Sequence, residues 1–444
     1  MDGAAQVINA GLNVRTNFSL PENFIYPLRH AISEGKISMQ TIDSRVADVL
    51  RVKFMMGLFD NPYKGDTKKL EKVVHCKEHQ NVSMRAALES IVLLKNENNI
   101  LPLSKSIKKV AVIGPNAAEV DNLICRYGPA NAPIKTVYQG IKDYLPDSEV
   151  RYAKGADIID EYFPESELYD VPLNKTEETM IDEAVALAKE SDVAIMVLGG
   201  NEKTVREEYS RTNLDLCGRQ EKLLQAVYAT GKLVILVMID GRAATINWAE
   251  RYIPGIVHAW FPGEFMGDAI AKVIFGDYNP GGKLAVTFPR SVGQIPFAFP
   301  FKPGSDSKGF VRVTGSLYPF GYGLSYTTFD YSALKIENPV IGTQGSVKLS
   351  CRVKNTGKIA GDEVVQLYLH DEVSSVTTYV KVLRGFERIH LQPGEEKVVD
   401  FVLTPQDMGL WNKDNHFIVE PGTFAVMVGS SSQDIRLQGK FEVK

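Results

Sequence analysis

The sequence predicts an α/β protein that ends in an all-β domain, and two patterns predict it. Short, continuous apolar runs alternate with amphipathic helical stretches from about residue 80 to 300. This alternation is typical of a parallel sheet that is covered by helices on both faces. From about residue 345, apolar and polar residues alternate one by one, as they do in strands with one buried face.

Length and composition narrow the class of protein. A chain of 444 residues suggests about two to four domains. The formal net charge of −4 argues against a nucleic-acid partner or an anionic membrane surface. No apolar run approaches the roughly 18 residues that are needed to span a bilayer. The opening MDGAAQVINAGLNVRTN has neither the basic nor the apolar region of a signal peptide, which leaves the compartment open, with periplasmic and secreted locations included.

The first sixty residues are predominantly helical. A short strand is predicted over 12–18, a helix over 21–35, and a second helix that stops at Gly57 and carries apolar residues at helical spacing. These elements are too few to close a core of their own, so they are expected to belong to a larger domain.

The middle of the chain predicts the sheet and its helices. Strands are expected at 110–114, 193–200, 233–239 and 255–261, and helices at 177–190, 219–230 and 267–275. Ligands bind at the carboxyl ends of the strands in such sheets. The residues that follow 193–200 therefore lie at the edge where a site is expected.

A connector and a sandwich follow. Residues 301–330 are rich in Gly, Pro, Ser and aromatic residues, which is typical of a connector. Val347, Leu349, Cys351 and Val353 alternate with polar residues, and the turn signals NTGK, QPGE and EPGT separate the later strands. This pattern predicts a β-sandwich of the immunoglobulin or fibronectin type.

Several kinds of site find no support in the sequence. GDYNPGGKL (276–284) is one residue too long for a phosphate-binding loop and has Leu where Ser or Thr would hold magnesium. His75 and His79 lack the HExxH pattern, and no G-x-S-x-G elbow is present. No metal or cofactor is therefore expected. Four widely spaced cysteines are expected to be free thiols: Cys76, Cys125, Cys217 and Cys351.

The acidic loop TVREEYSRTNLDLCGRQ (204–220) is the candidate for catalysis. It places Glu207 beside Glu208, between Arg206 and Arg211. A general acid needs a pKa raised towards neutrality. Two adjacent carboxylates raise each other's pKa, whereas the arginines lower it. These residues alone leave both a proton donor and a salt-bridged surface loop open.

Several separated segments resemble glycoside hydrolase family 3, the β-glucosidase and β-xylosidase group. They are LESIVLLKNENNILPL (88–103) with VAVIGPNA, HAWFPGEFMGDAIAKVIFGDYNPGGKLAVTFPRSVGQIP (258–296), YPFGYGLSYTTF (318–329) and RGFERIHLQPGEEKVV (384–399). The resemblance covers essentially the whole chain, with the motifs in the family's order.

The resemblance implies a domain plan. Residues 1–75 are expected to be the final part of a (β/α)8-type barrel with its linker. Residues 76–300 are expected to form an α/β sandwich of five or six strands that carries the acidic loop. A connector at 301–340 and a fibronectin type III-like domain at 341–444 complete the plan.

The same resemblance implies the catalytic roles. Glu207 matches the family's general acid/base, and Glu208 is the alternative if the loop is shifted by one residue. The nucleophile of the family is a barrel Asp in a Ser-Asp-aromatic motif. Here Ser-Asp occurs only at residues 191–192 and 305–306, with no aromatic after it. We therefore expect no nucleophile in this chain.

The expected function is that of a retaining, exo-acting β-glycosidase, which hydrolyses terminal non-reducing β-D-glucosyl or β-D-xylosyl residues of oligosaccharides or aryl β-glycosides. The chain is expected to be an amino-terminally truncated, inactive portion whose partner is the missing barrel domain. The alternative is a non-catalytic carbohydrate-binding or assembly module that complements a separate barrel chain. Without the barrel, residues 1–58 should expose apolar side chains such as Val46, Leu50 and Phe54, and should aggregate or be partly disordered.

Overall fold

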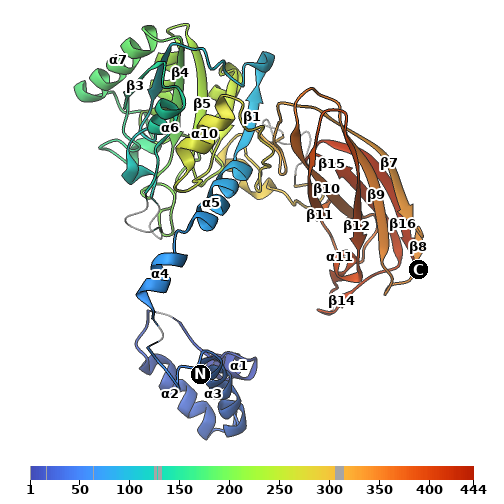
Figure 1. Ribbon diagram of the computed structural model, residues 1–444. Coiled ribbons are helices and arrows are strands. Elements are labelled where there is room, and N and C mark those ends of the chain that lie inside the picture. The colour runs from blue at the N-terminus through green and yellow to red at the C-terminus, as the bar shows by residue number, and fades with distance from the viewer. Residues whose placement is uncertain (1, 17, 64, 125–127, 129–132, 306–314) are drawn as a thin grey trace. The chain divides into compact units, whose positions relative to one another are not determined.

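The computed structural model describes residues 2–16, 18–63, 65–124, 128, 133–305 and 315–444. Its contacts divide the chain into two units, residues 1–79 and residues 80–444 (Figure 1). Among the helices described, none is both long and apolar enough to cross a membrane.

The first unit is a small helical assembly. Its helices are α1 (Asp2–Asn9), α2 (Glu22–Ser33), α3 (Met39–Met55) and α4 (Thr67–Val73). Ala5, Ile8, Ala31 and Ile37 form its small buried core. The strand predicted over 12–18 is wrong, because residues 12–16 have no regular structure. A strand needs a hydrogen-bonded neighbour, and the described part of this unit offers only helices.

Apolar side chains are exposed along α3, as expected. Val46, Leu50 and Phe54 are all exposed, and none of the residues of α3 is buried. This helix therefore has an apolar face that the described residues of the unit leave uncovered. Aggregation or disorder of this segment remains a prediction.

The α/β domain begins with α5 (Lys77–Ser90) and is built on six strands. They are β1 (Val92–Asn96), β2 (Lys109–Ile113), β3 (Glu149–Ala153), β4 (Val193–Gly199), β5 (Leu233–Ile239) and β6 (Gly255–His258), in the spatial order β1-β6-β5-β4-β2-β3. All neighbours are parallel except β1, which is antiparallel to β6. The four predicted strands are β2, β4, β5 and β6, and the six-stranded sheet agrees with the resemblance.

Helices cover both faces of this sheet, and the strand side chains alternate between two cores. Along β5, Ile235 and Val237 belong to one core, and Val234 and Leu236 belong to the other. The first core is closed by α5, α6 (Val137–Tyr144) and α10 (Met266–Ile274), and the second by α7 (Lys175–Lys189), α8 (Gln220–Tyr228) and α9 (Asn247–Tyr252). Burial on both faces explains why these strands are continuous apolar runs.

Two glycines let α6 and α10 pack side by side (Figure 1). A Cβ added at Gly140 of α6 would lie 2.2 Å from the backbone carbon of Gly267 in α10. A Cβ at Gly267 would lie 2.2 Å from the carbonyl oxygen of Thr136. The two backbones therefore approach more closely than any side chain would allow.

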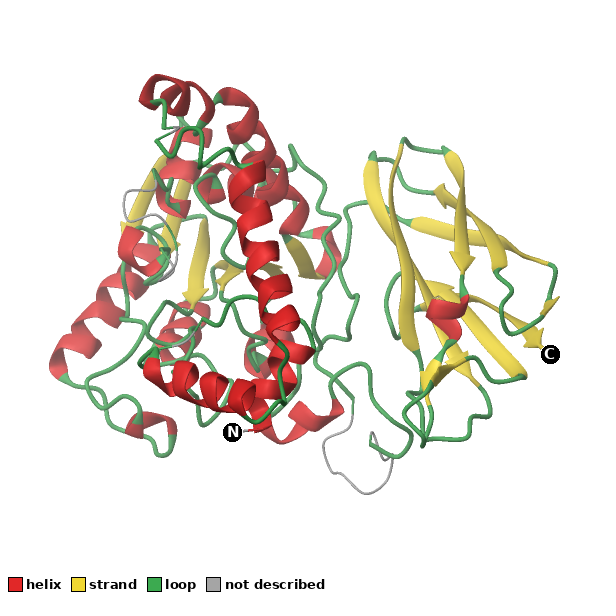
Figure 2. Cartoon of the chain, turned by 90° about the horizontal axis from the view of Figure 1, so that it is seen from below, coloured by secondary structure: helices red, strands yellow, loops and turns green. Residues whose placement is uncertain are grey.

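The carboxyl-terminal domain is a β-sandwich, and Figure 2 shows that strands make up nearly all of it. One sheet has the order β11-β10-β15-β16-β8 and the other β12-β9-β7. Its elements are β7 (Phe329–Glu337), β8 (Val340–Ile341), β9 (Val347–Asn355), β10 (Gly361–Asp371), β11 (Val382–Leu391), β12 (Glu396–Leu403), α11 (Pro405–Met408), β13 (Leu410–Trp411), β14 (Phe417–Ile418), β15 (Gly422–Gly429) and β16 (Ile435–Val443). The alternation predicted in β9 is confirmed, since its four apolar residues are all buried. The sandwich begins with β7, inside the range expected for the connector.

Polar contacts join the α/β domain, the connector and the sandwich. The Lys283 ammonium lies 3.0 Å from the Glu363 carboxylate, with side chains only 12% and 6% exposed. Arg388 of β11 donates to the Tyr278 hydroxyl at 2.9 Å. The connector also borders β1, because the Leu324 backbone N–H donates to the Leu93 carbonyl at 2.9 Å.

Candidate active site

The acidic loop (204–220) starts just beyond the carboxyl end of β4 and leads into α8. The turn at Gly199 is possible only for glycine. Its φ is +142°, and a Cβ there would lie 2.0 Å from the carbonyl oxygen of Ile239 in β5. The chain therefore leaves the sheet at the edge where ligand sites of α/β proteins lie, as the sequence predicted.

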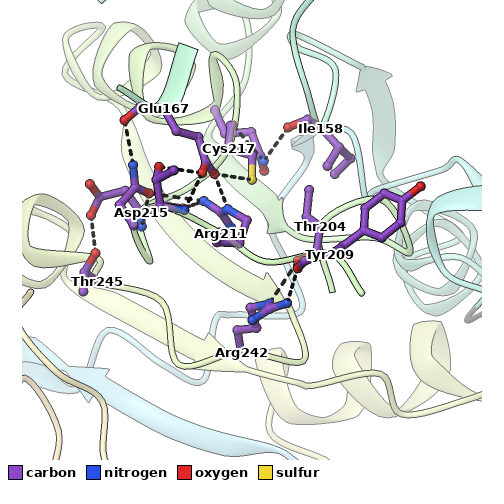
Figure 3. Close-up of polar contacts among 12 residues, drawn as sticks. Ile158, Glu167, Thr204, Tyr209, Arg211, Asp215, Cys217, Arg242 and Thr245 are labelled. Atoms are coloured by element: carbon purple, nitrogen blue, oxygen red, sulfur yellow. Dashed lines mark hydrogen bonds and ion pairs between the residues drawn. The ribbon is translucent and has the colours of Figure 1, made fainter. Parts of the chain in front are cut away.

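Arg242 holds the first half of the acidic loop (Figure 3). Its Nε donates to the Thr204 carbonyl at 3.0 Å and its Nη2 donates to the Tyr209 carbonyl at 2.9 Å. Asp240, at the end of β5, accepts the Arg242 backbone N–H at 2.9 Å. One guanidinium thus fixes both ends of the segment that contains Glu207 and Glu208.

Glu167 holds the second half of the loop (Figure 3). Its carboxylate pairs with the Arg211 guanidinium, and both side chains are almost fully buried. It also accepts the Thr212 backbone N–H at 2.9 Å, and its own carbonyl accepts from Asn213 at 3.1 Å. A buried, hydrogen-bonded ion pair of this kind fixes the position of the loop, because separating the pair would leave a buried charge without its partner.

Gln220 closes the base of the loop. Its amide accepts from the Gly199 N–H at 2.8 Å and donates to the Gly199 carbonyl at 2.9 Å and to the Cys217 carbonyl at 3.1 Å. The start and the end of the loop are thereby joined through one buried side chain. The Cys217 thiol is also buried, and burial raises its pKa to about 12, which keeps it protonated.

The two glutamates lie at the exposed part of this fixed loop. Glu207 and Glu208 are both exposed, and Glu208 has a φ of +71°. The arginines that flank them in sequence have other partners. Arg206 lies 3.3 Å from Glu202 and covers the ring of Tyr209, and Arg211 is buried against Glu167. The two glutamates therefore lie at an exposed part of an anchored backbone, and the neighbouring guanidinium groups of Arg206 and Arg211 contact Glu202 and Glu167.

Of the two Ser-Asp pairs, the one whose aspartate the structure describes does not bring a second carboxylate to this loop. Asp192 precedes β4 and accepts the backbone N–H groups of Lys108 and Lys109 at 3.2 and 2.9 Å. It therefore lies at the opposite end of the strand from the acidic loop and has a structural role. Of the second pair, Ser305 is described and Asp306 lies outside the described residues.

The structure also places the residues that the sequence set aside. His75 precedes α5, with a φ of +56°, so it does not share a helix with His79. Lys283 of the near-miss phosphate loop pairs with Glu363 instead. Across the described residues, no group of three or more His, Cys, Asp and Glu side chains is placed to hold a metal ion. Cys76, Cys217 and Cys351 are free thiols, and Cys125 lies outside the described residues.

Sequence reasoning missed Asp240, Arg242 and Glu167. Asp240 is buried, and burial raises its pKa to about 6. The available signal was the polar triplet Asp-Gly-Arg directly after the apolar run of β5, at the carboxyl edge of the sheet. Glu167 gave no such signal, because it lies 44 residues before its partner.

Comparison with known proteins identifies the class as that of the glycoside hydrolases. The model of the glycosyl hydrolase family 3 C-terminal domain matches residues 91–326, which is more than half of the chain. The model of the fibronectin type III-like domain matches residues 363–432. The chain belongs to glycoside hydrolase family 3.

Individual relatives agree with this family. A β-xylosidase of Formosa agariphila is 40% identical over 439 residues, which cover 96% of this chain and 58% of that protein. A periplasmic β-glucosidase of Salmonella typhimurium is 38% identical over 436 residues, which cover 93% of this chain and 57% of that protein. A solved β-glucosidase of Erythrobacter marinus superposes with a TM-score of 0.88 at 36% identity, over all of this chain and 60% of its own. The chain thus spans under two thirds of the length of these relatives.

Proposed function

We propose that this chain supplies the general acid/base of a retaining, exo-acting β-glycosidase, and that Glu207 is that residue, with Glu208 as the alternative. The observation that carries the proposal is the anchored acidic loop. Arg242 and Glu167 fix its two halves, and the exposed carboxylates lie between them at the carboxyl edge of the sheet. A proton donor must be held in place while it remains accessible to a substrate.

The chemistry follows from the double displacement that retaining glycosidases use. A nucleophilic carboxylate attacks the anomeric carbon while Glu207 gives its proton to the leaving oxygen. Glu207 then takes a proton from the water that releases the sugar. The two carboxyl groups must lie about 5–5.5 Å apart. We propose that the nucleophile is a barrel Asp outside these 444 residues, and that terminal β-D-glucosyl or β-D-xylosyl residues are the substrates, as the names of the relatives suggest.

The test has two arms. The purified 444-residue chain should release no measurable nitrophenol from aryl β-glucosides or β-xylosides, because it lacks the attacking carboxylate. In a complete enzyme that joins this chain to a family barrel, Glu207→Gln should lower kcat by roughly 10²–10⁴-fold for substrates with poor leaving groups. The loss should be much smaller for dinitrophenyl glycosides, whose leaving group needs no proton.

Glu208→Gln is the matched control, since it removes the neighbouring carboxylate from the same loop. A large loss in Glu208→Gln alone would move the role to that residue. Equal, small losses in both variants would refute the acid/base assignment. Robust turnover by the isolated chain that disappears in Glu207→Gln would show that the nucleophile lies within these residues after all.

The second candidate function is that of a non-catalytic carbohydrate-binding or assembly module that complements a separate barrel chain. The exposed apolar residues of α3 favour it, because Val46, Leu50 and Phe54 form a face that another polypeptide could cover. The coding sequence upstream of Met1 separates the two functions. An in-frame barrel with a Ser-Asp-aromatic motif supports the single enzyme, and a stop codon followed by a separate barrel gene supports complementation.

A further inference from the structure

A cavity of about 270 Å³ lies at one end of the sandwich, away from the acidic loop in sequence. It is formed where β10 ends and β11 and β15 begin. Asp371 pairs with Phe424 across β10 and β15, and Leu369 pairs with Val382 across β10 and β11. The loop 372–381, α11 and the β13–β14 hairpin supply the other walls.

The floor of this cavity is apolar. Leu369, Met408 and Phe424 line it and are all buried. They belong to the core of the sandwich, so the floor is rigid. A ligand with at least one apolar face is needed to cover it.

The rim carries two exposed aromatic side chains. Trp411 is 65% exposed and Tyr379 is also exposed. Phe417 holds the indole edge-on, with ring centroids 5.6 Å apart and planes at 63°. Gly409 leaves room for that arrangement, because a Cβ there would lie 2.3 Å from the Phe417 ring. The hairpin therefore orients a large aromatic surface that the residues described in the structure leave mostly exposed.

Charged groups of both signs complete the rim. Asp371 and Arg384 line the cavity together with Asp407. Burial raises the pKa of the Asp371 carboxyl. Asp407 is occupied, since it accepts the Thr404 N–H and hydroxyl at 2.8 and 2.7 Å. The charge of Arg384 interacts with that of Asp407, and no hydrogen bond joins its side chain to another of the residues that the structure describes.

We propose that this cavity is a second carbohydrate site, which binds one pyranose ring of a β-linked gluco- or xylo-oligosaccharide. The C–H face of such a ring lies flat on an aromatic side chain, and its equatorial hydroxyls accept from a guanidinium and donate to a carboxylate. Acidic peptides are disfavoured by Asp371 and basic peptides by Arg384, whereas a neutral polyol satisfies both. This site goes beyond the proposed hydrolysis and does not depend on it.

Isothermal titration of the full 444-residue chain with cellotetraose and with xylotetraose tests the site. Trp411→Ala should weaken binding at least tenfold, because it removes the stacking surface. Arg384→Met should also weaken it, since it keeps the aliphatic stem and removes the donors. Phe386→Ala is the matched control. Phe386 is also 65% exposed, on the same domain, and does not line the cavity, so binding should be unchanged.

The result that overturns the proposal is equally direct. Wild-type chain that binds neither tetrasaccharide, or that binds equally well in Trp411→Ala and Arg384→Met, excludes a site here. Preference for cellotetraose would show that the pocket accepts the C6 hydroxymethyl group, and preference for xylotetraose that it does not. In a complete enzyme, turnover of an aryl monoglycoside should not change in Trp411→Ala, which separates this site from the proposed acid/base.

Discussion

Asp240 is the residue whose environment departs most from that of an ordinary aspartate. It lies at the end of β5, is buried, and accepts the backbone N–H of Arg242. Burial raises its pKa to about 6, although the nearby guanidinium groups of Arg242 and Arg211 act against the shift. The carboxyl therefore titrates next to Arg242, the residue that holds the loop that carries Glu207.

This raised pKa predicts a pH-dependent stability. The folded state favours the protonated carboxyl, so the contribution is fully present below pH 4, near the unfolded pKa, and is lost as the pH rises through about 6. Asp240→Asn lacks this dependence. Relative to wild type, it should gain roughly 3 kcal/mol in free energy of unfolding between pH 4 and pH 7.5.

Urea unfolding of both proteins at the two pH values measures the difference. Asp330→Asn, at an exposed position of β7, is the control and should show a far smaller change. A gap between Asp240→Asn and wild type that stays constant with pH, or that moves in favour of wild type, would contradict the raised pKa.

At the level of single residues, the sequence indicated only part of the candidate active site. Glu207 and Glu208 could be singled out because two adjacent glutamates follow a predicted strand and match a family motif. The roles of Arg242 and Glu167 could not, because both act through contacts across 33 to 45 residues of chain. Local patterns carry no information about such pairings.

Among the elements, the contact of α6 with α10 depends on the absence of a side chain at Gly140. Replacing a glycine within a helix by alanine normally stabilises a protein by up to about 1 kcal/mol. Gly140→Ala should instead destabilise the α/β domain by about 1–3 kcal/mol, because the added Cβ meets the backbone of Gly267.

Gly3→Ala is the control within a helix, since a Cβ at Gly3 of α1 meets nothing within 4 Å. Chemical unfolding of the two variants and wild type provides the comparison. If Gly140→Ala is as stable as wild type, the helices can separate at little cost and the close approach is not required.

The sequence predicted elements well where one physical requirement dominated. β5 matches the predicted range 233–239, and α7, α8 and α10 differ from theirs by one or two residues at each end. β3 was missed because its sequence EVRYA is only partly apolar, as suits an edge strand with partial exposure. β1 was missed because its apolar residues continue directly from a helical stretch, α5.

At the scale of the whole molecule, the Lys283–Glu363 pair is a buried ionic contact between the α/β domain and the sandwich. Glu363→Ala should cost about 3–5 kcal/mol, because it leaves the Lys283 ammonium buried without its partner. Lys283→Met combined with Glu363→Leu should recover most of that loss, since it removes both charges together.

The control is an exposed pair in the same sandwich. Glu337→Ala removes the partner of Lys335, and both side chains are at least half exposed, so the cost should be below about 1 kcal/mol. Equilibrium unfolding in urea gives all four values. Similar losses of unfolding free energy in Glu363→Ala and Glu337→Ala would show that solvent reaches the junction and that its ion pair adds nothing to the coupling of the domains.

The order of the domains could be predicted from periodicity alone, since a change from helical to alternating spacing marks the change of architecture. Their limits could not. The sandwich begins with β7 at Phe329. The sequence does not show this limit, because β7 starts within the aromatic-rich connector and is recognised as a strand only by its pairing with β9.

The hydrogen bond from the Leu324 N–H to the Leu93 carbonyl affects which residues must accompany the α/β domain when it is transferred between genes. Together with the Tyr322 hydroxyl, which donates to the Leu94 carbonyl at 3.1 Å, it covers the outer edge of β1. A sheet edge left bare invites pairing with other chains. A gene fusion that copied the α/β domain without residues 317–326 would therefore expose an unpaired strand edge that can associate with other chains. The match to the family's C-terminal domain model extends to residue 326 and therefore includes this covering strip.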